Sequence, residues 1–199
     1  MRTTFALIGI LLLATSANAA SPIQTAGPEV WNGKVQAGFN PIGFQAGFQN
    51  TSVSGYKISG DVAGLVGSTK ALSIWLGGAF NPTIGTFGCH DYINSKKFLV
   101  SNNCGNDLQF SAFVMLTLEK LLQIPLVPFV RGGLTGDALL FDKTGGAVGV
   151  RVGGGVHYYI IRTVGLGIET NFTFGPGFLY GGTFFYGSWD FAFGARFSF

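Results

Sequence analysis

Charged side chains are scarce in this chain. Lys, Arg, Asp and Glu make up 11% of the residues, whereas soluble domains contain about 25%. The formal net charge is only +3, which is too small for the basic surface of a nucleic-acid-binding protein. The low charge therefore argues against a soluble fold with a charged exterior, and against nucleic acid as a partner.

Long apolar runs are also missing. The mean hydropathy is +0.40 and 15% of the residues are aromatic. Beyond the first twenty residues, however, the chain has no run of about 18 apolar residues, the length that a transmembrane helix needs. A closed β-barrel is the other structure that crosses a bilayer with its backbone hydrogen bonds satisfied. The 32 glycines, poor helix formers, point the same way.

The N-terminus has the pattern of a secretory signal peptide. Arg2 is followed by a short apolar stretch over residues 5–14 and by the small-x-small site Ala17-Asn18-Ala19. An uncleaved anchor is the alternative, but the apolar stretch is too short to cross a bilayer. The expected division is a signal peptide over residues 1–19, a periplasmic lead-in over 20–32 and an outer-membrane β-barrel over 33–199.

The last stretch, residues 188–199, alternates strictly. One parity holds Trp189, Phe191, Phe193, Ala195, Phe197 and Phe199, and the other holds Ser188, Asp190, Ala192, Gly194, Arg196 and Ser198. This period predicts a β-strand with one apolar face. A soluble lipocalin-like barrel or a sandwich would place that face inside. The other face would then be the surface, and it carries about one charge per strand, which suits the interior of a small transmembrane barrel better.

Similar segments recur about eight times. The strands are expected near 33–48, 56–66, 70–80, 107–119, 126–136, 146–160, 163–174 and after 182. The parity flips at Pro41, which predicts a β-bulge within one long first strand. A turn over residues 40–43 is the alternative.

The connections alternate in length. Those expected at 67–69, 120–125 and 161–162 are short, and those at 81–106, 137–145 and 175–182 are longer. Short periplasmic turns and longer external loops are typical of outer-membrane barrels. The sequence therefore predicts an all-β, eight-stranded antiparallel up-and-down transmembrane β-barrel.

The C-terminal residues carry a family resemblance. Gly194, Phe197 and Phe199 match the G-x-x-Φ-x-Φ ending that the barrel assembly machinery reads in Gram-negative outer-membrane proteins. Residues 127–134, 153–159 and 165–169 look like the second half of the OmpA-like and opacity-type outer membrane β-barrel family. The resemblance implies an outer-membrane location, with lipid and the assembly machinery as partners. It says little about activity, because one fold hosts several functions.

A belt of charges is expected inside the barrel. Eight strands enclose an interior just wide enough for side chains to fill. Estimated hairpin centres place five inward charges at mid-height, with Arg131 beside Arg151 and Glu169 beside Asp190. The predicted belt consists of Asp61, Arg131, Arg151, Glu169 and Asp190. Opposite charges there would neutralise one another, since unpaired buried charges are costly. A closed interior is favoured over a gated constriction.

Cys89 and Cys104 are the two cysteines, and both fall in the longest predicted external loop. In an exported protein they are expected to form a disulfide. Metal binding by these cysteines with His90 and Asp91 is the alternative, but one irregular cluster gives it little support, and no metal site is predicted.

His157 and Glu169 are the one pair that suggests acid–base chemistry. A lipid A deacylase resembles this fold and uses a His with a nearby Ser. Here Tyr159 stands two residues after His157, so a packed interior His–Tyr pair is expected instead. The sequence thus predicts no catalytic residue and no cofactor.

The expected function follows from these points. The chain is predicted to be a non-enzymatic outer-membrane protein with a structural or adhesin-type role, whose external loops meet an extracellular ligand or a host surface. A small pore or carrier of apolar solutes is the alternative, and a lipid A-modifying enzyme is a third.

Overall fold

The computed structural model describes residues 34–48, 53–69, 72–87, 90–93, 97–100, 105–118, 125–140, 144–161, 163–179 and 181–199. All regular structure in these segments is β-strand. Within them there is no helix long and apolar enough to cross a membrane.

The described residues form eleven strands. They are β1 (Val35–Gly47), β2 (Ser54–Lys57), β3 (Ser59–Ser68), β4 (Ser73–Phe87), β5 (His90–Ile93), β6 (Lys97–Val100), β7 (Asn106–Thr117), β8 (Leu126–Leu140), β9 (Thr144–Ile161), β10 (Val164–Leu179) and β11 (Gly182–Ser198). β2 and β3 are separated only by Ile58 and fill one place in the sheet, between β1 and β4. The β5–β6 pair forms a sheet of its own.

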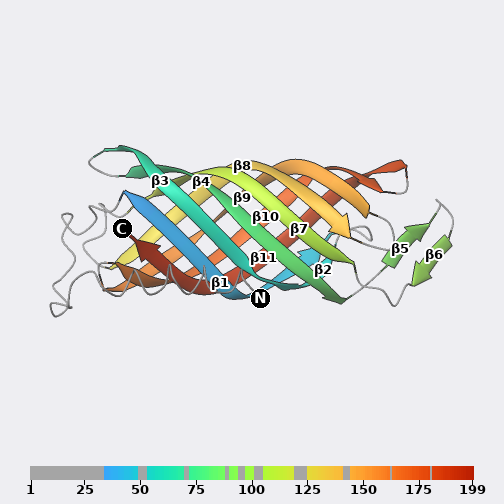
Figure 1. Ribbon diagram of the computed structural model, residues 1–199, viewed down its shortest axis with the longest axis horizontal. Helices are drawn as coiled ribbons and strands as arrows, with labels where there is room; N and C mark the ends of the chain where they lie inside the picture. The colour runs from blue at the N-terminus through green and yellow to red at the C-terminus, as the bar shows by residue number, and fades with distance from the viewer. Residues whose placement is uncertain are drawn as a thin grey trace, which may run out of the picture.

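The main sheet closes on itself. Each strand pairs antiparallel with the next, and β1 also pairs with β11 over ten residue pairs, from Gln36↔Ser198 to Gly47↔Ser188. The result is the predicted eight-stranded antiparallel barrel (Figure 1). We call the end where β1 begins and β11 ends the terminal end. The opposite end carries the β5–β6 hairpin, which Figure 1 shows beyond the barrel, and we call it the hairpin end.

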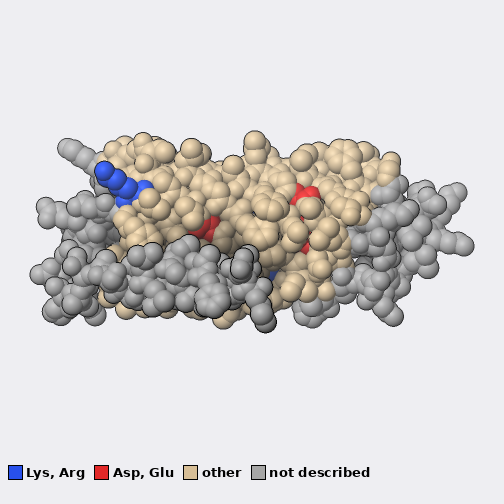
Figure 2. Space-filling model, viewed as in Figure 1, with Lys and Arg blue, Asp and Glu red and all other residues tan. Residues whose placement is uncertain are grey.

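The barrel is polar inside and apolar outside. On β10, for example, Glu169, Asn171 and Thr173 are buried, whereas Ile168 and Phe172 are 50% and 42% exposed. Figure 2 shows that the described surface on the face turned to the viewer, where β1, β3, β4 and β7 lie in Figure 1, carries few charged side chains. A soluble core has the reverse arrangement. This alternation is that of a membrane-spanning barrel, whose outer face contacts lipid.

The β-bulge predicted at Pro41 is confirmed. β1 runs through it as one strand, and its register against β11 shifts between Phe39 and Ile42. Proline has no N–H for the ladder and is tolerated in strands at such irregularities. The buried residues change from even to odd numbers at this point, as Asn40 and Gln45 illustrate.

The connections predicted at 81–106, 137–145 and 175–182 are shorter in the structure, because the strands beside them are longer. β4 continues to Phe87, and residues 137–140 and 175–179 belong to β8 and β10. Asp137 is therefore an interior residue and not a loop residue. Gly and Pro in these segments favoured loops, but cross-strand pairing extends the ladder through them, for example at Pro176↔Phe185. Gly181, with φ of 76°, makes the tight turn that follows.

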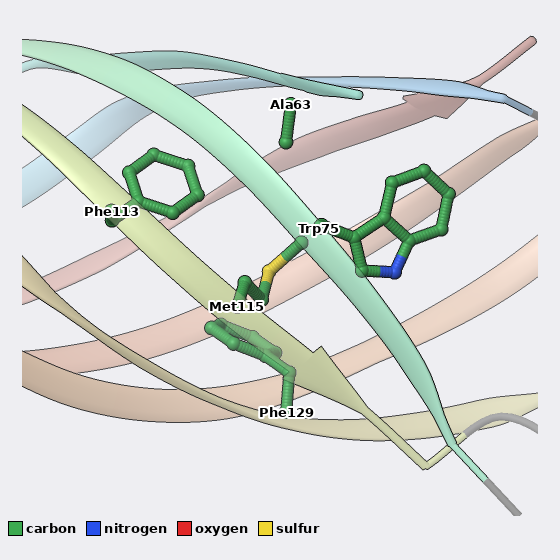
Figure 3. Packing of buried hydrophobic residues seen from close by; sticks show 5 residues of the cluster. All are labelled: Ala63, Trp75, Phe113, Met115 and Phe129. Atoms are coloured by element: carbon green, nitrogen blue, oxygen red, sulfur yellow. The ribbon is translucent and has the colours of Figure 1, made fainter. Parts of the chain in front are cut away.

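The interior is layered from one end to the other. Toward the terminal end, a buried apolar cluster comprises Ala63, Trp75, Phe113, Met115 and Phe129 (Figure 3). Toward the hairpin end, a second one comprises Val53, Leu139, Ala147 and Tyr186. We call them the terminal-end cluster and the hairpin-end cluster. Polar side chains fill the space between them. Among the described strands, β8 alone contributes side chains to both clusters and to the polar layer, from Phe129 through Arg131 and Asp137 to Leu139.

Candidate functional site

The polar layer between the two clusters is the candidate functional site. It contains five ion pairs, and every side chain in them is at most 4% exposed. The five residues of the predicted charge belt, which are Asp61, Arg131, Arg151, Glu169 and Asp190, all point into the interior and are buried. Their pairing, however, divides them into two groups.

The first group lies next to the terminal-end cluster. Arg131 binds Glu169 with an Nη2–Oε1 distance of 2.8 Å, and its other Nη lies 3.6 Å from Asp61. Asp61 also pairs with Arg196 of β11. The Arg131 guanidinium sits 5.5 Å from the ring centre of Phe113, a cation–π contact with the apolar cluster. Two cations and two carboxylates thus neutralise each other in this group.

The second group centres on Asp190. Its carboxylate contacts Lys57 Nζ at 2.9 Å and both terminal nitrogens of Arg151 at 2.9 Å, a bidentate arrangement. Asn171 joins the two groups, because its Nδ2 donates to Asp190 at 2.9 Å and its Oδ1 accepts from Arg131 Nε at 2.8 Å. The network therefore extends along much of the barrel interior.

Gln109 of β7 connects the second group to the opposite wall. Its Oε1 accepts from Lys57, Asn81 and Arg151. Its Nε2 donates to Asp137 at 2.8 Å and to Thr173 at 3.3 Å. A single amide thus ties together strands from both sides of the barrel, which fixes the packing of the interior.

The register explains why one belt became two groups. Arg131 lies opposite Gly153, and Arg151 opposite Gly133, so the two arginines are diagonal neighbours and not directly paired. Glu169 lies opposite Ala192, whereas Asp190 lies opposite Asn171. A shift of two residues keeps a side chain on the same face but moves it along the barrel. The predicted direct pairings of Arg131 with Arg151 and of Glu169 with Asp190 were therefore wrong: in each case the partners are shifted by two residues along the strand.

Four interior charges were missing from the predicted belt. They are Lys57, Asp107, Asp137 and Arg196, all buried. Asp107 and Asp137 continue the inward parity of Gln109 and Arg131, and Arg196 that of Asp190. Lys57, Asp107 and Arg196 lie on the inward parity of strands that the sequence already predicted, so parity alone would have found them. Asp137 fell in a predicted loop, and only a longer strand there would have included it.

His157 is packed and not poised as a base. Its ring stacks on Phe129 at a centroid distance of 4.3 Å, and Tyr159 meets it edge-on at 6.3 Å. Its Nε2 accepts a hydrogen bond from Arg196 Nε at 3.1 Å. With that lone pair engaged and the ring 2% exposed, His157 has a structural part in the terminal-end half of the interior.

The other predicted residues lie at the ends of the chain or outside the described part. Gly194 and Phe197 belong to β11, and the Phe199 carbonyl accepts from the amides of Lys34 and Val35, which ties the ring at the terminal end. Cys89 and Cys104, the signal peptide over 1–19 and the lead-in over 20–32 lie outside the described residues. Within the described part there is no group of three or more His, Cys, Asp or Glu side chains that could hold a metal ion.

The polar layer links strands on opposite sides of the barrel and fills the lumen between them. Ion pairs and amide hydrogen bonds cross the lumen, and an apolar cluster fills it on either side. Side chains thus fill the interior, as the width of an eight-stranded barrel allows.

No protein-family model matches this chain, and no curated protein matches it. Among solved structures, the crystal structure of Neisserial surface protein A (NspA) aligns with a TM-score of 0.57 and 13% identity, over 83% of this chain and 96% of that one. The N-terminal β-barrel domain of Pseudomonas aeruginosa OprF aligns with 16% identity over the same shares, with a TM-score of 0.48. Ail of Yersinia pestis aligns with 9% identity over 82% of this chain and 96% of that one, with a TM-score of 0.46. At these identities the comparison establishes the fold alone: the chain has the fold of the eight-stranded outer-membrane β-barrels.

Proposed function

We propose that this protein is a closed barrel of the outer membrane that acts through its hairpin end, as a non-enzymatic surface-interaction protein. The observation that carries the proposal is the filled interior, in which two apolar clusters and five ion pairs occupy the lumen. A barrel with a filled lumen would contact its partners through the loops at its ends, where binding residues are usually found.

The hairpin end is the better candidate for contact with a partner. The connections at the terminal end are 69–72, 118–125 and 162–163, while the 88–105 connection at the other end is the longest and carries β5 and β6. Two other connections at the hairpin end, 141–143 and 180–181, are as short as those at the terminal end. The long 88–105 connection is therefore what would orient the hairpin end outward, since external loops are usually longer than periplasmic turns. An extracellular ligand or a host surface is the proposed partner.

Lipid and the barrel assembly machinery are the other proposed partners. Thirty large apolar side chains are exposed on the described surface, and hydrocarbon would cover those of the strands. The segment that the machinery reads would be the end of β11, with Phe197, and Phe199 directly after the strand.

Replacing the 88–105 connection by a short glycine-serine turn tests the proposal. β4 and β7 are paired up to Ile84↔Asn106, so the barrel should remain intact without the segment between them. We expect the variant to reach the outer membrane and to keep heat-modifiable migration on SDS gels. We also expect cells that carry it to lose adherence to host-cell monolayers, relative to cells with the intact protein. Equal adherence of both would refute the role of the hairpin end.

Fractionation tests the location separately. The intact protein should sediment with the outer membrane, and a soluble periplasmic protein would contradict the proposal.

A further inference from the structure

Two interior carboxyl groups have no cationic partner. The five ion pairs use Asp61, Glu169 and Asp190, and among the described residues no Lys or Arg nitrogen lies within 4.0 Å of Asp107 or Asp137. Both carboxyls are buried, with exposures of 0% and 5%. An ionised carboxylate in such a place is costly unless it is paired.

The two groups are neighbours on one wall of the barrel. Asp107 lies opposite Leu139, and Asp137 opposite Gln109, so they are diagonal partners on the inward face, with their Cβ atoms about 7 Å apart or less.

Only neutral groups donate to these carboxyls. Tyr186 Oη donates to Asp107 Oδ2 at 2.6 Å, and Gln45 Nε2 donates to the same oxygen at 3.1 Å. Gln109 Nε2 donates to Asp137 Oδ1 at 2.8 Å. The site therefore binds carboxyl oxygens without supplying positive charge by direct contact.

Hydrogen-bond donors are also too few around this pair of carboxyl groups. Asp107 Oδ1 and Asn81 Oδ1 are buried acceptors without a hydrogen-bond donor. Asn81 lies opposite Gln109 on the neighbouring strand, diagonal to Asp107. Buried acceptors are normally satisfied, so two unsatisfied ones beside a carboxyl pair point to a missing proton donor.

The charge balance of the interior gives the same result. Four buried cations, which are Lys57, Arg131, Arg151 and Arg196, face five buried carboxyls, which are Asp61, Asp107, Asp137, Glu169 and Asp190. With all nine ionised, the described interior would carry a net charge of −1, from four positive and five negative charges. One bound proton makes it neutral.

We propose that Asp107 and Asp137 form a proton-sharing carboxyl pair, and that its proton keeps the hairpin-end cluster closed. A proton suits the place better than a metal ion, because Lys57 and Arg151 face the same space and would repel a cation.

The pair lies directly under the hairpin-end cluster. Leu139 is the cross-strand partner of Asp107, Ala147 is that of Asp137, and Tyr186 is bonded to Asp107. Removal of the proton at high pH would place a second negative charge beneath these apolar side chains. The cluster would then loosen, and the hairpin end of the lumen would admit water.

The groups that share this space come from every surrounding element. The charged or titratable ones are Lys57 of β2, Arg151 of β9, and Tyr186 and Asp190 of β11; β1, β4, β7 and β10 contribute the neutral Gln45, Asn81, Thr83, Gln109 and Thr173. Lys57 and Arg151 both bind Asp190 and keep it ionised, which leaves the carboxyl pair as the place for the proton.

Infrared spectroscopy of the purified full-length barrel in detergent tests the proton directly. A protonated carboxylic acid has a carbonyl stretch that carboxylates lack and that shifts in D2O. We expect this band in the wild type at neutral pH and its loss in Asp107→Asn/Asp137→Asn. Glu169→Gln/Arg131→Met, which removes both members of an ion pair and leaves the net charge of the interior unchanged, is the matched control and should keep the band.

Hydrogen exchange tests the link to the cluster. In the wild type, amides in the hairpin-end halves of β8 and β9 should lose protection from exchange at alkaline pH. This loss should be smaller in Asp137→Asn, because the amide side chain at position 137 cannot ionise. Three results would overturn the proposal: a wild type without the band at neutral pH, a band that survives in the double variant, or protection that depends on sodium or potassium and not on pH. The wild-type spectrum decides the first of these even if a variant fails to fold.

Discussion

The hydroxyl of Tyr56 donates a hydrogen bond to the main-chain carbonyl of Pro41 on the outer face of the barrel. The bulge at Pro41 interrupts the ladder between β1 and β11. In lipid there is no water to satisfy a freed carbonyl, and each unsatisfied backbone group costs several kcal/mol. Tyr56 thus supplies the donor that the bulge removes.

We therefore expect Tyr56→Phe to lower the free energy of unfolding in lipid by about 1–3 kcal/mol, the cost of leaving an acceptor unpaired where water does not reach it. Urea unfolding in lipid vesicles measures it. Tyr158→Phe removes a hydroxyl elsewhere on the outer face and serves as the control. Equal effects of the two substitutions would show that the Pro41 carbonyl does not depend on Tyr56.

Asp190 is expected to be the most sensitive member of the ion-pair network. Asp190→Asn would leave Lys57 and Arg151 buried without a carboxylate, and removal of one member of a buried pair costs about 3–5 kcal/mol. Lys57→Met should cost less, because Arg151 and Asn171 still bind Asp190. Urea midpoints in the opposite order would contradict the assignment of Asp190 as the centre of the group.

Gly194 lies where β11 approaches the bulge of β1. A Cβ atom there would overlap the carbonyl oxygen of Phe39 and the Cα of Asn40, whereas a Cβ at Gly64 would meet nothing within 4 Å. Gly194→Ala should destabilise the barrel by about 1–3 kcal/mol, the usual cost of overpacking, and Gly64→Ala should not. Similar stability of the two variants would mean that the seam between β1 and β11 can spread to accept a side chain.

The filled lumen predicts that the protein does not conduct ions. Purified protein reconstituted in planar lipid bilayers should give no discrete conductance steps at neutral pH, because ion pairs and two apolar clusters occupy the interior. Reproducible single-channel openings of the wild type would favour the pore over the surface-interaction role.

Cys89 and Cys104 are expected to be joined in the protein isolated from cells. Closing a loop of this length limits the freedom of the unfolded chain by about 3 kcal/mol in the chain-entropy model. Mass spectrometry after alkylation should detect labelled cysteines only when a reductant has been added first. Labelling without reductant would show that the two thiols are free, and that no disulfide restrains the 88–105 connection.

Alternation along the chain predicted the barrel, its inward and outward faces and the bulge at Pro41. These features depend on local period, and a period of two is visible in a single sequence. The interior residues Asp61 and Arg131, for example, follow from parity alone.

The contacts between side chains did not follow from parity. Whether Arg131 meets Glu169 or Arg151 depends on the exact centre of each hairpin, and the turns at 141–143 and 180–181 are tighter than the glycine-rich sequence around them suggested. Lys57 and Asp190 are 133 residues apart, and they meet across the lumen only after the whole ring has closed. Such pairings depend on the three-dimensional register of all the strands, which no local pattern contains.

The pairing of β1 with β11 also has a consequence for biogenesis. The strand that closes the ring, β11, follows all the other strands of the ring in the chain, so β1 has no permanent partner on that side until β11 has been synthesised. Until then its free edge could pair with other chains. Closure of the barrel is therefore one step between its first and last strands, and it cannot occur before β11 is present.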